Sequence, residues 1–233
     1  MTVAAEGSMA KARRFAAWSA LIAAPLAWLN IVLYLVVSGG DTALLFDPAR
    51  ALVLPAGMID LFRFGQLLDS FGYYLPMLPI GGYLCARLRG GGGPLVDAAA
   101  WSLVVYVMLG IIGTSMQTIA LPLLADMHQS TDPVVKAGSE TAWLLTVHIA
   151  QRAFWWMEGP TFAFWALVTG AAMRAQGLRF GRLLMALGAG YALYFLLAFI
   201  RADAVAELVE LVAVLPVPLW LILLGSDLWR DRA

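Results

Sequence analysis

The chain contains little cysteine, histidine or charge. Among its 233 residues there are one cysteine and two histidines, and 13% of the residues are charged. The single cysteine, Cys85, excludes an internal disulfide and any metal site made of several cysteines. Two histidines leave little material for a haem or zinc centre. We therefore expect no metal and no cofactor, and we expect Cys85 to be a small core residue.

Charges of opposite sign balance, since fifteen basic and fifteen acidic side chains give a formal net charge of zero. Such a chain has no general attraction to nucleic acid, and we expect no partner of that kind. Apolar residues, by contrast, are in excess: they make up 62% of the chain, and the mean hydropathy is +0.82. A soluble domain is about half apolar and about a quarter charged. The excess predicts a protein whose main partner is the lipid bilayer.

Six apolar runs are long enough for helices that cross a hydrocarbon core of about 30 Å. Each is apolar round its whole circumference, as in helices surrounded by lipid, whereas barrel strands are about ten residues long and alternate. The first run is longer than a signal-peptide core of about 7–15 residues, so we expect it to stay uncleaved. The sequence thus predicts an all-α, single-domain bundle of six transmembrane helices, over residues 15–37, 64–86, 98–125, 142–173, 183–200 and 204–225.

The orientation follows from the basic residues in the connecting segments, which favour the cytoplasmic side. One side receives ten of them: Lys11, Arg13, Arg14, Arg87, Arg89, Arg174, Arg179, Arg182, Arg230 and Arg232. The other side receives five: Arg50, Arg63, Lys136, Arg152 and Arg201. We therefore expect a multi-pass protein of a bacterial inner membrane with both termini in the cytoplasm.

Two of the outer connecting segments contain helix-start motifs. Asp47-Pro48 and Asp132-Pro133 each resemble an N-cap followed by proline at the first helical position, which predicts short surface helices over the outer mouth of the bundle. The inner loop over residues 89–94 contains four consecutive glycines without the lysine of a phosphate-binding loop. We expect a flexible link there.

The second, fourth and sixth predicted spans run from outside to inside, and each begins with an arginine followed six positions later by a carboxylate. The pairs are Arg63 with Asp69, Arg152 with Glu158, and Arg201 with Glu207, and Glu210 adds a carboxylate one turn below Glu207. An offset of six places the members of a pair about 120° apart on their helix. We therefore expect these arginines to balance carboxylates of other helices.

These carboxylates fall within the predicted membrane. At about 1.5 Å per residue, Glu158 lies about 24 Å from the inner end of its span, Glu210 about 26 Å and Asp69 about 27 Å. All three reach the outer third of a core about 30 Å thick, and Gln117 of the third span reaches a similar level. A charge facing lipid inside the core costs about 2.5–3.5 kcal/mol at mid-helix, so we expect the carboxylates to face one another inside the bundle.

The fourth span presents polar and aromatic side chains at intervals of three or four, which share one helix face. They are His148, Gln151, Trp155, Glu158 and Phe162, with Arg152 at the edge of this face. Prolines follow the carboxylates in all three spans and are expected to kink them, which opens a cavity toward the outside. The candidate ligand-binding zone comprises Arg63, Asp69, Gln117, His148, Gln151, Arg152, Trp155, Glu158, Arg201, Glu207 and Glu210.

Three functions remain open for this zone. The leading hypothesis is a polar cavity in the outer half of the bundle that binds or moves a small polar or amphiphilic ligand, with Glu158 as its central ionisable group. The second is an ion-pair network that fixes helix register in a structural or regulatory subunit, bound to a membrane partner or to a second copy of the chain. The third is a membrane enzyme that acts on lipid at the outer leaflet.

We favour a non-enzymatic role because two features of catalytic sites are missing from the sequence. A di-iron bundle needs Glu-x-x-His motifs, and the chain contains none. His148 is a candidate general base, but no nucleophile stands at a readable spacing from it. Ser115 and Thr146 are the unsupported candidates.

The aromatic residues near the zone have two interpretations. Trp155 and Trp156, beside Tyr73 and Tyr74, either hold a cation or sugar against their ring faces or belong to the outer aromatic belt, and we favour the belt. His128 is expected in an outer loop in contact with solvent. The aromatic residues expected at the inner interface are Trp101, Trp220 and Trp229.

Three stretches suggest a family. They are Leu61-Phe62-Arg63-Phe64-Gly65 at the start of the second span, the turn Gly177–Arg182 between the fourth and fifth spans, and Pro218–Gly225 near the end of the last span. In these stretches and in the spacing of its apolar runs, the chain resembles small six-span bacterial integral membrane proteins grouped only as a domain of unknown function. The resemblance implies a six-helix fold and carries over no catalytic residue and no ligand.

Overall fold

The structure is a computed structural model that describes residues 3–41 and 43–230. Every regular element in this part of the chain is a helix, as the sequence predicts. The elements are α1 Val3–Ser38, η1 Leu44–Phe46, α2 Pro48–Ala51, α3 Ala56–Asp69, η2 Ser70–Tyr74, α4 Met77–His128, α5 Pro133–Ile149, η3 Ala150–Phe154, α6 Trp155–Ala175, α7 Gly181–Phe199, α8 Asp203–Val214 and α9 Val217–Arg230.

Four stretches of the described chain are long and apolar enough to cross a membrane. They are Gly7–Ser38, Ala56–His128, Gly181–Phe199 and Asp203–Arg230. Large apolar side chains on the outside of these helices are exposed, Trp101 by 72% and Phe199 by 69%. Exposed apolar surface of this extent is typical of a protein that contacts lipid. The chain therefore has the helices of a membrane protein.

The longest of these stretches, 73 residues, turns back on itself at Gly93. The backbone of Gly93 has φ 55° and ψ −148°, a conformation that glycine adopts far more readily than other residues. Residues on opposite sides of the turn meet: the Cys85 thiol donates to Asp97 at 3.4 Å, and the rings of Tyr74 and Tyr106 lie 5.3 Å apart. The two arms are therefore packed antiparallel, as two separate helices.

The glycine-rich segment differs from the expected flexible link. Helix α4 continues through Gly92 and resumes at Pro94, so that the turn is confined to Gly93. An ion pair of 2.8 Å between Arg89 Nε and Asp97 Oδ1 joins the two arms beside the turn. The helical hydrogen bonds and this ion pair thus give regular structure to a segment that four glycines would leave flexible in isolation.

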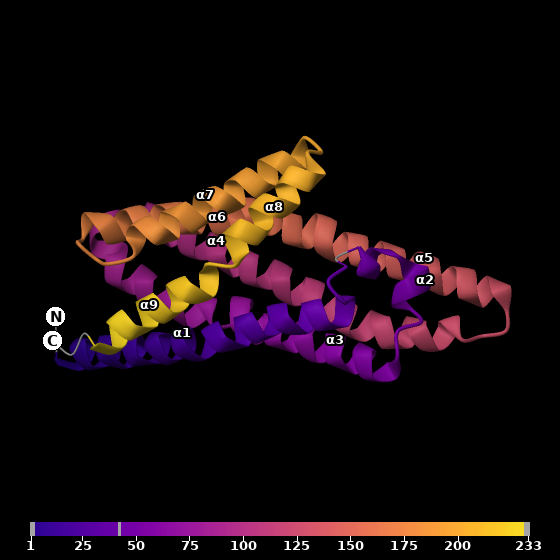
Figure 1. The fold of residues 1–233 in the computed structure, drawn as a ribbon. Coiled ribbons are helices and arrows are strands. Elements are labelled where there is room, and N and C mark those ends of the chain that lie inside the picture. Colours follow the sequence, from indigo (N-terminus) through magenta and orange to yellow (C-terminus); the bar gives the residue numbers. More distant parts are fainter. Residues whose placement is uncertain (1–2, 42, 231–233) are drawn as a thin grey trace.

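The helices lie roughly along one long direction (Figure 1). Helix α1 begins and α9 ends at one end of the molecule, on the left in Figure 1, which we call the terminal end. At the opposite end, which we call the cap end, lie η1, α2 and the turn between α4 and α5.

Small residues allow the helices to approach closely in the terminal half of the molecule. The fully buried residues of α1 there are Ala16, Ala17, Ala20, Ala23 and Ala24. A Cβ atom on Gly225 of α9 would lie 2.9 Å from Leu21 Cγ, and one on Gly188 of α7 would lie 2.8 Å from Ala166 Cβ. Such contacts are the usual way in which membrane helices pack.

The cap end is closed by contacts between the η1–α2 segment and α5. The Trp143 indole is fully buried and donates to the Leu45 carbonyl at 2.8 Å. Asp41 and Arg50 form an ion pair of 2.8 Å on the surface of this segment. The hydrogen bond from Arg50 is the main reason why the pKa of Asp41 is below its ordinary value.

Several helix boundaries and side chains differ from expectation. Asp132 does cap a helix, since its carboxylate accepts from the Val134 amide at 2.8 Å, but this helix is the 17-residue α5, not a short surface helix before a span at 142. His128 is not solvated: its side chain is 12% exposed and its Nδ1 lies 3.3 Å from Ser139 Oγ. Trp220 is fully buried, so it does not belong to a belt at the interface.

Candidate functional site

Carboxylates of three different helices lie within electrostatic range of one position: Glu158 in α6, with Asp69 at the end of α3 and Glu210 in α8. Asp69 and Glu210 both lie near enough to Glu158 to act on its charge. Glu158 is buried, with 6% of its surface exposed, whereas Asp69 and Glu210 are partly exposed. We call these three residues the acidic zone. Their proximity makes the zone strongly negative whenever more than one of them is ionised.

Aromatic side chains surround Glu158. The Tyr74 hydroxyl donates to the Glu158 carboxylate, but Glu158 Oε1 has no hydrogen-bond partner within the described chain. The rings of Tyr106 and Phe162 lie 5.1 Å apart, and those of Phe162 and Tyr191 lie 4.4 Å apart. Glu158 is therefore a buried acid in an aromatic cage that satisfies only part of its hydrogen-bonding capacity.

Asp69 has a polar partner on the first helix. Asn30 Nδ2 in α1 donates to Asp69 Oδ1 at 2.9 Å. Near this pair, two further buried polar atoms, Gln66 Oε1 and the Tyr73 hydroxyl, have no hydrogen-bond partner in the described residues. Unsatisfied polar atoms are rare in folded proteins, and two of them lie close to Asp69 along the chain.

The arginines of the candidate zone do not balance these carboxylates, contrary to expectation. Arg63 pairs with Asp60 of its own helix at 3.3 Å, on the surface. The Arg152 guanidinium lies 5.4 Å from the centre of the Phe46 ring. Arg201 is exposed and has a left-handed backbone conformation, with φ 59°. The charged groups that act on Glu158 and Glu210 are other carboxylates.

The polar face of the fourth predicted span divides into two. Gln151 Nε2 donates to Gln117 Oε1 of α4 at 3.4 Å. The buried Trp155 indole nitrogen has no partner in the described chain and points toward Gly113, which also lies in α4. His148 faces the cap instead, where its ring lies 5.5 Å from that of Phe46. The Gln151, Trp155, Glu158 and Phe162 side chains thus continue into the bundle, where Gln117 of α4 meets Gln151.

A change in helix winding explains this division. Segment η3 (150–154) is a π-helical turn, in which the Trp155 amide donates to the carbonyl of residue 150, five positions earlier. Segment η2 (70–74) is a second π turn, with a 2.9 Å bond from the Leu75 amide to the Ser70 carbonyl. One turn directly follows Asp69 and the other precedes Glu158. Turns of this kind occur frequently at functional sites.

The third carboxylate-bearing helix is also interrupted. Helix α8 ends at Val214, and α9 begins at Val217 after a break at Leu215-Pro216, as the proline predicts. Glu207 is exposed on α8, and Glu210, one turn nearer the break, is partly buried. Both act electrostatically on Tyr34 of α1 and on Tyr194 of α7. Every helix that supplies a carboxylate to the acidic zone is thus irregular at that level.

The tyrosines are the functional candidates that sequence reasoning missed. Tyr106 and Tyr191 lie in the third and fifth predicted spans, which carry no charge, and both are buried beside Glu158. Tyrosine in a membrane helix usually lies at the interface. The signal available in the sequence was the position of these tyrosines in the middle of their spans. Trp156, expected in the outer belt, instead stacks on Phe195 of α7 at 4.5 Å.

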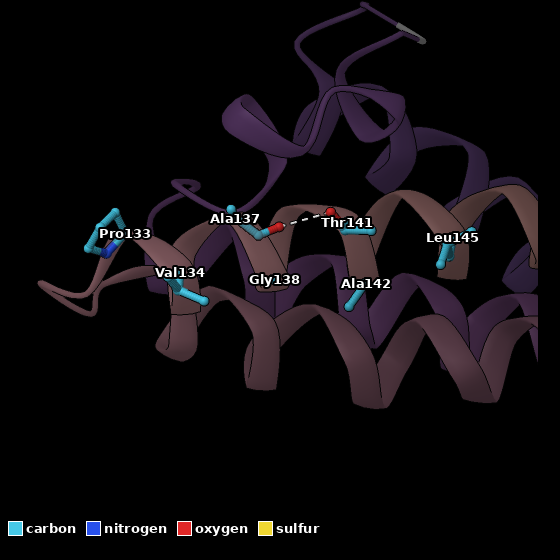
Figure 2. Close-up of a pocket in the computed structure, with 7 residues that line it drawn as sticks. All are labelled: Pro133, Val134, Ala137, Gly138, Thr141, Ala142 and Leu145. Carbon is cyan, nitrogen blue, oxygen red and sulfur yellow. Dashed lines mark hydrogen bonds between the residues drawn. The ribbon is translucent and has the colours of Figure 1, made fainter.

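A shallow apolar groove of about 680 Å³ follows α5, away from the acidic zone (Figure 2). Figure 2 shows that its lining side chains come from this helix and that the Thr141 hydroxyl donates along the helix to the Ala137 carbonyl, at 2.9 Å. The groove is lined by Pro133, Val134, Ala137, Gly138, Thr141, Ala142 and Leu145. None of these side chains is ionisable, so the groove is suited to apolar contacts only.

In residues 3–41 and 43–230, no three side chains of histidine, cysteine, aspartate or glutamate are grouped so that they could hold a metal ion. The Thr146 hydroxyl donates to the Ala142 carbonyl of its own helix at 2.8 Å. His148 contacts Phe46 and lies near Arg152.

Comparison of the chain with protein-family models, with curated proteins and with solved structures gave no match.

Proposed function

We propose that the chain crosses a bacterial inner membrane six times, with both termini in the cytoplasm. Helix α1, the two arms about Gly93, the stretch 133–175, α7, and α8 with α9 would each supply one crossing. An even number of crossings fits a chain in which α1 begins and α9 ends at the same end of the molecule. The excess of basic residues at that end supports a cytoplasmic location.

We further propose that the acidic zone binds or moves a small ligand and that this ligand is positively charged. The observation that carries the proposal is Glu158, a buried carboxylate whose Oε1 has no partner in the described chain and whose charged neighbours are also acidic. An unpaired charge at this depth is costly, about 2.5–3.5 kcal/mol on the most lenient scale at mid-helix. Proteins keep such a group when it has a function.

The surroundings of Glu158 favour an organic cation over a strongly hydrated metal ion. The aromatic side chains near Glu158 are Tyr74, Tyr106, Tyr191 and Phe162, and the negative face of an aromatic ring attracts an ammonium group. A carboxylate at the centre of an aromatic cage is a common way to bind a quaternary ammonium. Two of the guanidinium groups that would compete for this carboxylate are engaged elsewhere, since Arg63 pairs with Asp60 and Arg152 lies over the Phe46 ring.

Binding of tetramethylammonium to the purified protein tests the proposal. We expect saturable binding by calorimetry, and we expect Glu158→Gln to weaken it by about tenfold or more, because one ionic contact of about 1.4 kcal/mol is lost. Glu140→Gln is the matched control, since Glu140 lies in α5 outside the acidic zone. Absence of binding to the native protein, or equal binding by both variants, would show that the proposal is wrong.

A structural or regulatory subunit is the second candidate, and the groove along α5 favours it. Gly138 and Ala142 lie one turn apart in this groove, and small residues at that spacing allow a helix of another protein to approach closely. A partner should then co-purify in mild detergent at a fixed stoichiometry. Gly138→Leu should abolish this, and Gly57→Leu, at a site with equal free space, should not. Purification of the native chain alone would count against this candidate.

A further inference from the structure

A small cavity lies between α1 and α3, beside Gln66, one helical turn before Asp69. Its volume of about 10 Å³ is close to the least that holds one water molecule. The cavity is lined by Asn30, Leu33, Tyr34 and Val37 of α1 and by Leu61, Phe62, Gly65 and Gln66 of α3. It is too small for an organic cation, so it is separate from the cation site proposed at Glu158.

Both helices bring a hydrogen-bond acceptor to this cavity. Gln66 is 8% exposed, and its buried Oε1 has no hydrogen-bond partner in the described residues. Asn30 uses its amide nitrogen to donate to Asp69 at 2.9 Å, so its Oδ1 is the acceptor that remains. This oxygen faces Gly65, since a Cβ atom there would lie 3.5 Å from it. A ligand with two donors would satisfy both acceptors.

The number of polar groups favours water over a metal ion. Hard cations such as Mg²⁺ and Ca²⁺ take about six to eight oxygen ligands, whereas a buried water makes about two to four hydrogen bonds. Three polar side chains line the cavity, namely Asn30, Tyr34 and Gln66, and the other lining residues are apolar or glycine. This set is sufficient for a water molecule and too small for a dehydrated metal ion.

The depth of the cavity makes it accessible to water. Gln66 stands three positions, about 4.5 Å of helix, nearer the outer end of its span than Asp69. In the orientation proposed above, it therefore lies near the outer boundary of a hydrocarbon core about 30 Å thick. Water is available at that boundary, whereas lipid tails offer no hydrogen bond to a polar group.

We propose that this cavity binds one water molecule that bridges α1 and α3. Its two O–H groups donate to Gln66 Oε1 and to Asn30 Oδ1. Because Oδ1 is then engaged, the Asn30 amide keeps its nitrogen turned toward Asp69. The water thus satisfies a buried acceptor and orients the donor on which the Asp69 carboxylate depends.

Gly65→Ala tests this inference because it places a methyl group in the cavity. The new Cβ atom would lie 3.5 Å from Asn30 Oδ1 and 3.8 Å from Leu33 Cβ, which are ordinary contacts. Gly82→Ala in α4 is the matched control: nothing lies within 4 Å of a Cβ atom there, so it reports the gain in helix propensity alone. We expect Gly82→Ala to raise the midpoint of thermal unfolding in detergent by about 2 °C.

We expect Gly65→Ala to lower this midpoint by about 3 °C, because the methyl group displaces the water and leaves the two acceptors unpaired. X-ray footprinting detects the water itself, since radicals formed from a bound water oxidise the side chains beside it. Phe62, which lines the cavity and is 3% exposed, should be oxidised in the native protein and should lose most of this modification in Gly65→Ala. Trp165, which is 1% exposed in the terminal half, should stay unmodified in both.

Three results would overturn the inference. If Gly65→Ala raises the midpoint as much as Gly82→Ala, the cavity is an apolar packing defect that a methyl group fills. If Phe62 in the native protein is no more oxidised than Trp165, no water is bound beside it. If sodium chloride stabilises the native protein more than potassium chloride does, and this difference disappears in Gly65→Ala, the cavity holds a sodium ion instead of water.

Discussion

The two halves of this bundle are built differently. Toward the terminal end, alanine and glycine faces bring α1 close to α9 and α6 close to α7, and buried tryptophans fill the remaining space, as in the Trp165–Trp220 contact of 6.0 Å. Toward the cap end, two helices contain π turns, a third is broken, and Gln66, Tyr73, Trp155 and Glu158 each keep a buried polar atom without a partner in the described residues.

We infer that the terminal half mainly stabilises the fold and that the cap half contains the residues proposed to function. Close packing of small residues in the terminal half gains van der Waals contact, and substitution of these residues should be poorly tolerated. The half that contains the acidic zone retains irregular backbone and unsatisfied polar atoms, which cost stability and persist where they serve a purpose. Four substitutions test the distinction.

The largest effect is expected in the terminal half, at Gly181. A Cβ atom there would lie 2.6 Å from the backbone oxygen of Gly170, and backbone cannot move aside as a flexible side chain can. We expect Gly181→Val to destabilise the protein by about 3 kcal/mol, measured by thermal unfolding in detergent. Gly82→Val is the control, because nothing lies within 4 Å of a Cβ atom at that position. Equal losses in both variants would contradict close packing as the basis of stability in this half.

The second effect concerns Asn30, which provides the one hydrogen bond of 2.9 Å to the Asp69 carboxylate. Asn30→Leu should cost about 1.5–3 kcal/mol, because a partly buried acceptor loses a donor. A double-mutant cycle with Asp69→Leu isolates the contact: the two losses should not add, since either change alone removes the same bond. Additive losses would mean that Asn30 stabilises the helix packing and not the carboxylate.

The third effect is expected to be a gain in stability. Glu158→Met together with Tyr74→Phe removes the buried, incompletely paired acid and the hydroxyl that donates to it, and the double variant should raise stability by about 1 kcal/mol while abolishing cation binding. The measurement is thermal unfolding without ligand, and Glu207→Met, at an exposed site, should change stability by less than about 0.5 kcal/mol. A large loss in the double variant would instead support an ion-pair network that fixes the fold.

The smallest effect is expected in the cap itself. Arg50→Gln removes the hydrogen bond that lowers the pKa of Asp41 most, so this pKa should rise toward its ordinary value, while the Ala43 amide still donates to the carboxylate at 3.0 Å; NMR titration measures the change. A lowered pKa stabilises the folded state above the ordinary value, and this stabilisation is lost as the pH falls through the lowered pKa. The loss of stability over this pH range should be smaller in Arg50→Gln than in the native protein. Because the pair is exposed, unfolding near pH 7 should hardly change.

The sequence predicted the helices better than their ends. Long apolar runs have no stable alternative to helix in lipid, so the all-α fold follows from hydropathy. The start of α5 was missed because its first turns carry Lys136 and Glu140, and hydropathy detects only the part of a helix that lipid surrounds. The capping signal at Asp132 marked the true start, nine positions before the predicted one.

The acidic zone was predictable in part. Depth along each span follows from the helical rise alone, and it places Asp69, Glu158 and Glu210 at similar levels. Charge pairing was wrong because it depends on partners that spacing cannot reveal: Asp60 was available to Arg63 one turn away, and Phe46 reaches Arg152 from a distant segment. The π turns were also missed, since no residue type is obligatory in them.

The two π turns have a consequence for how this protein tolerates changes in length. Each contains one residue more than an α-helix needs for the same contacts, so the helix after it is out of phase with the helix before it by about 100°. Deletion of Ala153 would restore regular winding and rotate Glu158 away from Tyr74 while every chemical group remained present. The number of residues between the cap and Glu158, as much as their identity, therefore decides which way the acid faces.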